Sequence, residues 1–204
     1  GPFCAACGGW QLSRLLGQLY DDKGRITVPG FYDDVVEPSQ RFRDELAALP
    51  YTDEDWLQRS LTRSVGGEAG YSVLERLWTR PAIEVTSVIG GDPIGPSRAT
   101  VPSVVTADLS IRYVCDQTGA GIAEQLRRWV ADTVSDRFEY RLTVTPESAQ
   151  DPYRTPDDLP AVAALAEAMR EGFGRPAGRM GNAGGGPAGW LSESVGAPVV
   201  FFRV

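Results

Sequence analysis

The sequence predicts an α+β fold in which helices cover one face of an antiparallel sheet. Residues 82–88 alternate apolar and polar side chains, which is the period of a half-buried strand. Residues 101–114 and 138–144 also look extended, and a helical pattern at residues 122–134 separates them. This order of strand, strand, helix and strand follows an earlier helix. It therefore favours a sandwich of a helical layer and a sheet.

Residues 11–20 form the earlier helix in this prediction. Their leucines recur at helical spacing and would line one face of the helix: Leu12, Leu15, Leu16 and Leu19. Residues 25–28 then look extended before the turn predicted at Pro29 and Gly30.

Residues 38–64 carry the apolar stripe of surface helices, and Pro50 divides this region in two. Thr52 is followed three residues later by Asp55, which has the form of a capping box at the start of a helix. Ser72 and Glu75 have the same spacing. We therefore expect a helix to begin after Thr52 and another after Ser72.

The composition changes at Asp151, where a proline-rich linker begins. An alanine-rich helix at residues 161–173 and a short helix at residues 190–195 follow. Residues 197–202 are apolar throughout, which is typical of a strand buried on both faces. We therefore expect one unit at residues 1–150 and a second at residues 151–204.

Composition disfavours several classes of partner. The net charge of −7 disfavours nucleic acid, because phosphate recognition needs a basic face. No apolar run approaches the roughly 20 residues that a helix needs to span a bilayer, so we expect no membrane partner. Three cysteines, an odd number, do not indicate a disulfide-stapled domain and favour a cytoplasmic location.

Cys4 and Cys7 form a C-x-x-C pattern. Such a pair can act in redox chemistry or supply half of a zinc site. The two glycines that follow favour a third interpretation, in which both cysteines pack as small apolar residues. The pair is kept as a candidate thiol or redox site.

Residues 66–81, which begin Gly66-Gly67-Glu68, resemble a run found in the M20 family of zinc-dependent dipeptidases. Residues 28–35 and 107–112 are similar to further segments of that family, in the same order. The resemblance implies a ferredoxin-like lid domain that forms the dimer contact. Residues 1–150 would be this lid, with a helical insertion at about residues 25–81, and residues 151–204 a remnant of the family's α/β catalytic domain.

Members of that family hold zinc with histidines and carboxylates, whereas this chain contains no histidine. Hydrolytic zinc needs three or four converging ligands. The acidic pairs, such as Asp33 with Asp34, are adjacent in sequence and so do not converge on a helix. We therefore expect no metal site and no cofactor in this chain, although zinc is expected of the family.

The resemblance also implies a loop that binds the substrate carboxylate through an arginine and a glycine-rich turn. The corresponding residues here are Arg179, Asn182, Gly185 and Gly186. This chain lacks the serine of the family pattern, and the spacing from the arginine is longer. These four residues are the candidate substrate-binding site, and the sequence indicates no catalytic residue.

Three functions remain open on the sequence. The favoured one is a non-catalytic M20-like subunit that assembles through its lid, as a homodimer or as a heterodimer with a metal-bearing M20 homologue. The second is a fragment of a zinc-dependent dipeptidase or amidohydrolase. The third is a repurposed enzyme that uses Cys4 and Cys7 or carboxylates. Fold resemblance alone does not establish activity.

Overall fold

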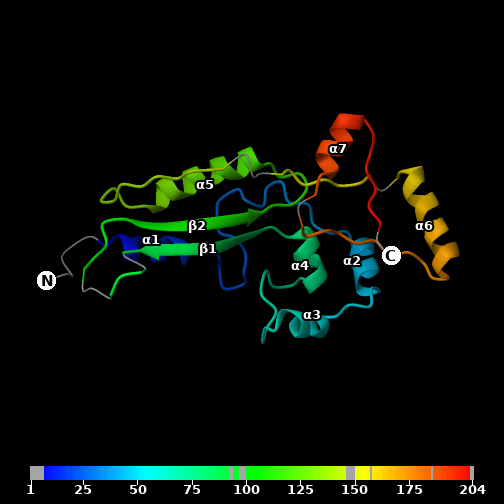
Figure 1. The fold of residues 1–204 in the computed structure, drawn as a ribbon, viewed down its shortest axis with the longest axis horizontal. Helices are drawn as coiled ribbons and strands as arrows, with labels where there is room; N and C mark the ends of the chain where they lie inside the picture. Colours follow the sequence, from blue (N-terminus) through cyan, green and yellow to red (C-terminus); the bar gives the residue numbers. More distant parts are fainter. Residues whose placement is uncertain are drawn as a thin grey trace.

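The computed structural model describes residues 7–91, 94–96, 100–145, 150–156, 158–184 and 186–202. An antiparallel hairpin lies along the long axis, and helices lie beside it and beyond one of its ends (Figure 1). The elements are α1 (Gly8–Leu16), α2 (Gln40–Ala47), α3 (Asp53–Ser60), α4 (Val73–Thr79), β1 (Ala82–Gly90), β2 (Val105–Arg112), α5 (Gly119–Thr133), α6 (Pro160–Phe173) and α7 (Ala188–Val195).

Strands β1 and β2 pair with Ile83 opposite Ile111 and Val85 opposite Leu109. The register shifts between Val85 and Ser87, where β1 carries a bulge. In β2 the odd-numbered residues are partly buried and the even-numbered residues are exposed, so one face of the hairpin is turned toward the core.

Helices α1 and α5 supply the other side of that core. Trp129 and neighbouring residues of α5 pack against Ile83 of β1, and Leu16 of α1 borders the same cluster. The most deeply buried side chains are Phe31, Leu19 and Ile83. The predicted α+β arrangement, with helices on one face of an antiparallel sheet, is therefore confirmed.

The helices beyond the hairpin begin where their caps predict. Thr52 and Asp55 form a reciprocal capping box at the start of α3, and Ser72 and Glu75 form another at the start of α4. Pro50 lies between α2 and α3, as expected. Figure 1 shows α2, α3 and α4 grouped beyond the end of the hairpin where β1 begins.

The first helix is shorter than predicted, because it ends at Leu16 rather than continuing to residue 20. The chain instead turns back on itself, and Tyr20 forms an isolated antiparallel bridge with Ile26. Gly24 stands in this turn with φ of +73°, and a Cβ built on it would lie 2.5 Å from the carbonyl oxygen of Gly67. Only glycine fits such an approach without strain.

Two predicted strands are wrong. Residues 138–144 form no strand, although Leu142 packs against the main core. Residues 197–202 form no strand either, and Phe201 and Phe202 are each 64% exposed. A strand exists only where a second strand satisfies its main-chain groups, and the described residues offer no partner to either segment.

The described part of the chain holds no helix that is both long and apolar enough to span a bilayer. Helices α6 and α7 confirm the helices predicted after residue 151. The division of the chain near residue 150 stays a prediction.

Candidate functional site

The outer edge of β1, which faces away from β2, is the candidate interaction site. Near the start of β1 the hydroxyl of Tyr20 covers this edge. It accepts a hydrogen bond from the Ile83 N–H at 2.6 Å and donates one to the Ile83 carbonyl at 2.9 Å. Main-chain groups of an antiparallel strand point alternately toward and away from the partner. Val85 therefore presents its N–H and C=O outward in the same way as Ile83, as does Val88 after the bulge.

Beyond Ile83 this edge is open. Within the described residues, no main-chain group bonds to the outward groups of Val85 and Val88. Their side chains are 43% and 58% exposed, respectively, although they lie on the same face as the core. Residues 85–90 include no charged residue and no proline, the residue types that commonly protect an edge strand from pairing. The bulge is the protective feature that this edge does have.

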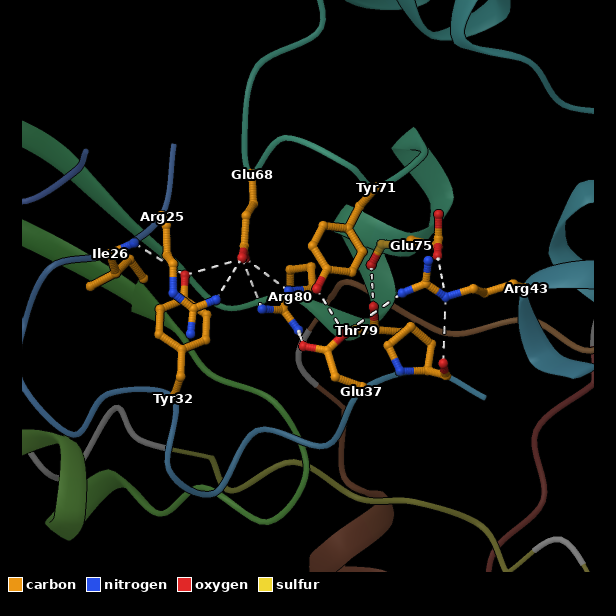
Figure 2. Close-up of polar contacts among 11 residues, drawn as sticks. Arg25, Ile26, Tyr32, Glu37, Arg43, Glu68, Tyr71, Glu75, Thr79 and Arg80 are labelled. Carbon is orange, nitrogen blue, oxygen red and sulfur yellow. Dashed lines mark hydrogen bonds and ion pairs between the residues drawn. The ribbon is translucent and has the colours of Figure 1, made fainter. Parts of the chain in front are cut away.

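A charge network with a buried centre joins the hairpin to the helices beyond it (Figure 2). At its centre Glu68 accepts two hydrogen bonds from Arg80, at 2.8 and 3.0 Å, and one from Arg25 at 2.9 Å. The side chains of Arg80 and Glu68 are only 2% and 8% exposed. Tyr32 also donates to Glu68, at 3.3 Å, and its ring lies 3.6 Å beneath the Arg25 guanidinium.

The same network extends toward α2 through Glu37. This carboxylate pairs with Arg80 at 2.9 Å and accepts a hydrogen bond from the Tyr71 hydroxyl at 2.7 Å. Arg43 of α2 reaches both Glu37 and Glu75 of α4. Three arginines and three carboxylates thus alternate across the junction, and this arrangement offsets the penalty of burying the central pair, Arg80 and Glu68.

The network shifts the ionisation of its members. The hydrogen bond from Tyr71 lowers the pKa of Glu37, and the Arg80 charge acts in the same direction. Burial raises the pKa of Tyr32 to about 12, and the Glu68 charge adds to this shift. Burial alone would lower the pKa of Arg80, but Glu68 raises it, so the guanidinium stays charged. The cluster is therefore a set of fixed charges and has the character of a structural junction.

Tyr32 and Tyr113 are expected to ionise late in an alkaline titration. Burial raises the pKa of both phenols to about 12, and for Tyr113 the hydrogen bond to Asp151 adds to the effect. Because the pKa is higher in the folded state, the protonated phenol favours the folded state. This contribution to stability is fully present below the ordinary pKa of 10.0 and is lost as the pH rises through about 12. The ultraviolet absorbance of tyrosinate should show a late phase, and Tyr32→Phe and Tyr113→Phe should each reduce it.

The contacts that the structure shows for the predicted substrate-binding residues are local or with α2. Arg179 lies 3.7 Å from Glu45 of α2, and the Asn182 side chain accepts a hydrogen bond from the Gly184 main chain at 3.0 Å. Gly186 borders a hollow of 840 Å³ between α5 and α7. Gly185 lies outside the described residues. Their assignment to a carboxylate site stays a prediction.

Close packing explains the glycines at positions 178 and 181, which lie just before the glycine-rich stretch at residues 184–186. A Cβ at Gly181 would lie 2.5 Å from Cβ and Cγ of Trp78, and one at Gly178 would lie 2.6 Å from Leu49. Arg112 of β2 also donates to the Ala183 carbonyl at 2.8 Å. The loop is thereby held against α4 and the end of the hairpin, and close packing accounts for the glycines at positions 178 and 181.

Gly181→Ala is expected to destabilise the protein by about 1–3 kcal/mol, because the added methyl group overlaps Trp78 and forces a backbone shift. Thermal unfolding followed by circular dichroism measures the effect. The control is Gly186→Ala, at which a Cβ meets nothing within 4 Å. Equal melting temperatures for the two variants would contradict the packing assignment.

Cys7 is a free, partly buried cysteine at the N-cap of α1, whereas Cys4 lies outside the described residues. The suggested thiol pair therefore stays a prediction. Among the residues that the structure describes, no three histidine, cysteine or acidic side chains gather closely enough to hold a metal ion.

Sequence reasoning missed both the charge network and the open edge. Glu68 and Arg80 lie within the run at residues 66–81, but their separation of twelve residues matches no helical or strand spacing. Arg25 and Glu37 come from still more distant segments. The absence of charge along residues 85–90 was the available signal for the edge.

Residues 10–137 match the family model described as a peptidase dimerisation domain, M20_dimer. The chain is 27% identical over 126 residues to human Beta-Ala-His dipeptidase, covering 62% of this chain and 25% of that protein. It is 23% identical over 129 residues to the protein of the same name from Rattus norvegicus, covering 63% and 26%. The chain thus spans about a quarter of the length of these relatives.

Solved structures share the fold over nearly the whole chain. Human carnosine dipeptidase 1 superposes with a TM-score of 0.75 at 24% identity, covering 94% of this chain and 41% of that one. An M20 family metallo-carboxypeptidase from Sulfolobus solfataricus gives 0.70 at 23% identity, covering 95% and 43%. At these identities the likeness establishes the fold.

Proposed function

Because the chain belongs to the M20 peptidase dimerisation domain family, we propose that it associates with a second copy of itself through the outer edge of β1. The observation that carries this proposal is that the outward main-chain groups of Val85 and Val88 have no partner in the described part of the chain and lie beside exposed side chains. Such an edge is a template for another strand.

A two-fold axis suits this edge. In a two-fold dimer the same patch is used on both subunits, so β1 would pair with β1 of the second copy and close the assembly at two chains. The exposed valines of the two copies would then meet on the helix-bearing face, because residues opposite one another across paired strands share a face. The main chain provides hydrogen bonds and the valines provide apolar contact.

Val88→Pro tests this proposal, because it removes an outward N–H without removing a donor from the β1–β2 ladder. Sedimentation velocity should show a dimer for the unmodified chain and a monomer for the variant, with circular dichroism unchanged. Val88→Lys is the second variant and places a charge at the same exposed position. A monomeric unmodified chain, or folded variants that both remain dimeric, would overturn the proposal.

The chain's own contribution in this proposal is assembly and not hydrolysis. The sequence contains no histidine, and histidine is the usual base for nucleophilic catalysis and a common zinc ligand. The purified chain is expected to bind no zinc and to leave a β-alanyl-histidine dipeptide intact. Zinc retained on native mass spectrometry together with hydrolysis of that dipeptide would contradict this part of the proposal.

A second candidate is that this chain is part of a longer dipeptidase. Its support is the match to Beta-Ala-His dipeptidases, of which the chain spans about a quarter. In that case the exposed phenylalanines near residue 200 would be covered by the rest of a catalytic domain. In a heterodimer, a metal-bearing homologue would cover the same phenylalanines with residues of another chain. Native mass spectrometry of the chain mixed with such a homologue distinguishes a mixed complex from the homodimer.

A further inference from the structure

Tyr20 decides where the open edge of β1 begins. Its hydroxyl accepts a hydrogen bond from the Ile83 N–H and donates one to the Ile83 carbonyl, so both outward groups of Ile83 are already bonded. One side chain here takes the place that the main chain of a neighbouring strand would take. A second strand can therefore bond to this edge from Val85 onward, but it cannot bond at Ile83 unless Tyr20 moves.

The fold holds Tyr20 at this place. Leu19, the residue before it, is 1% exposed in the main core, and Tyr20 itself forms the antiparallel bridge with Ile26. Burial of the phenol raises the pKa of Tyr20, so the hydroxyl keeps the proton that it donates to Ile83 at neutral pH. The cover over Ile83 is thus part of the folded chain.

The open edge also has a defined end. Strand β1 stops at Gly90, and Gly91 has φ of +80°, which takes the chain out of the extended conformation. By alternation along β1, and after the bulge, the outward main-chain groups between the two ends belong to Val85, Val88 and Gly90. No main-chain group of the described residues bonds to them.

Antiparallel pairing about a two-fold axis places this short edge onto itself. The first outward residue then lies opposite the last, so that Val85 meets Gly90 of the second copy and Val88 meets Val88. Each of these opposed pairs exchanges two main-chain hydrogen bonds. In this register the strand of the second copy ends before it reaches Tyr20, so neither copy has to displace that side chain.

A different register would be favoured if Ile83 were free. Shifting one strand by two residues places Val85 opposite Val88 and Ile83 opposite Gly90, which adds one bonded pair. The two-fold axis would then pass between the two copies of Ser87. Tyr20 blocks this register, because it occupies the Ile83 groups that the register needs.

We propose that Tyr20 sets the register of the dimer: by covering Ile83 it makes β1 pair with β1 of a second copy about Val88. This inference rests on the proposed function and adds to it the residue that selects the pairing. Tyr20 is a positioning residue, because its hydroxyl bonds to the main chain of its own copy and excludes the second strand from that position.

Disulfide formation between two copies measures the register. Val88→Cys places two thiols on opposed residues about 5.5 Å apart at Cα, within the range of a disulfide. Ser87→Cys does so only in the shifted register, because in the proposed one these residues are diagonal neighbours about 7–8 Å apart. After oxidation, mass spectrometry of the linked peptides should show a link between the two copies of position 88 and none between those of position 87. A link at position 87 instead would overturn the proposal.

Tyr20→Ala frees the outward groups of Ile83 and should move the link from position 88 to position 87. The added bonded pair should favour position 87 by at least about tenfold. Tyr153→Ala is the matched control: its hydroxyl also accepts a main-chain N–H, from Val199 at 2.9 Å, and its loss should leave the link at position 88. A link that stays at position 88 in folded Tyr20→Ala would contradict the role of Tyr20.

Tyr20→Phe keeps the test available if the alanine variant does not fold. It retains the ring and removes both hydrogen bonds to Ile83, so a link at position 87 should appear that is absent from the unmodified chain. No link at position 87 in this folded variant would again contradict the role of Tyr20.

Sedimentation velocity separates the failure of this inference from the failure of the proposed function. A dimer that is linked at position 87, or at neither position, keeps the association and removes the register. A chain that is monomeric before oxidation removes the proposed function, and the register with it.

Discussion

Replacing Glu68 by glutamine is expected to lower the free energy of unfolding by about 3 kcal/mol, the scale found when one partner of a buried ion pair is removed. The carboxylate accepts a forked pair of hydrogen bonds from Arg80 and another from Arg25. Glutamine preserves the size of the side chain but carries no charge and turns an NH₂ group toward the arginines. Arg80, with 2% of its side chain exposed, would then lose its main counter-charge.

Urea unfolding at neutral pH measures the loss, and Glu124→Gln is the matched control. Glu124 also pairs with two arginines, but its side chain is half exposed on α5, where ion pairs contribute little. The control should change the free energy of unfolding by less than about 1 kcal/mol. If the two variants had similar stabilities, the network would not be the junction between the hairpin and α2–α4.

Phe31→Ala is expected to destabilise the chain by about 3–5 kcal/mol, because truncating a buried phenylalanine removes its apolar contacts and leaves a cavity. The side chain is 1% exposed and lies in the cluster that joins β1 to α5. The main chain is held at the same place: the Phe31 carbonyl accepts a buried hydrogen bond from Gln117 at 2.7 Å. The site therefore has little freedom to collapse into the cavity.

Phe202→Ala is the control for this prediction. Phe202 lies in a segment that was predicted to be a buried strand, yet the ring is 64% exposed. Its removal should leave the melting temperature of the chain nearly unchanged, while Phe31→Ala should lower it by several degrees or more. A large loss on Phe202→Ala would show that residues 197–202 are covered in solution, as a partner or a larger domain would cover them.

Features that depend on neighbouring residues could be predicted from the sequence. The capping boxes at Thr52 and Ser72 need partners only three residues away, and both form. Likewise, the alternation along β1 and β2 and the helical period of α5 depend on which face meets the core. The α+β fold followed from these patterns, whereas the expectation of a dimerising lid came from the resemblance of residues 66–81 to the M20 family.

Partners that are distant in sequence decided the rest. Residues 138–144 have a strand pattern, but a strand also needs a neighbour to bond, and tertiary structure places none beside them among the described residues. The close approach of Gly181 to Trp78 likewise joins segments that are far apart in sequence.

The sequence by itself determined which segments would be helical, which faces would be apolar, and that no histidine is present for metal chemistry. Tertiary structure alone decided that Glu68 and Arg80 form a buried ion pair that Arg25 joins, and that the outer edge of β1 beyond Ile83 has no main-chain partner among the residues the structure describes. The physical reason is the distance along the sequence over which each interaction acts. Periodicity and caps act over a few residues, whereas ion pairing and strand pairing depend on which distant segments meet once the core has formed.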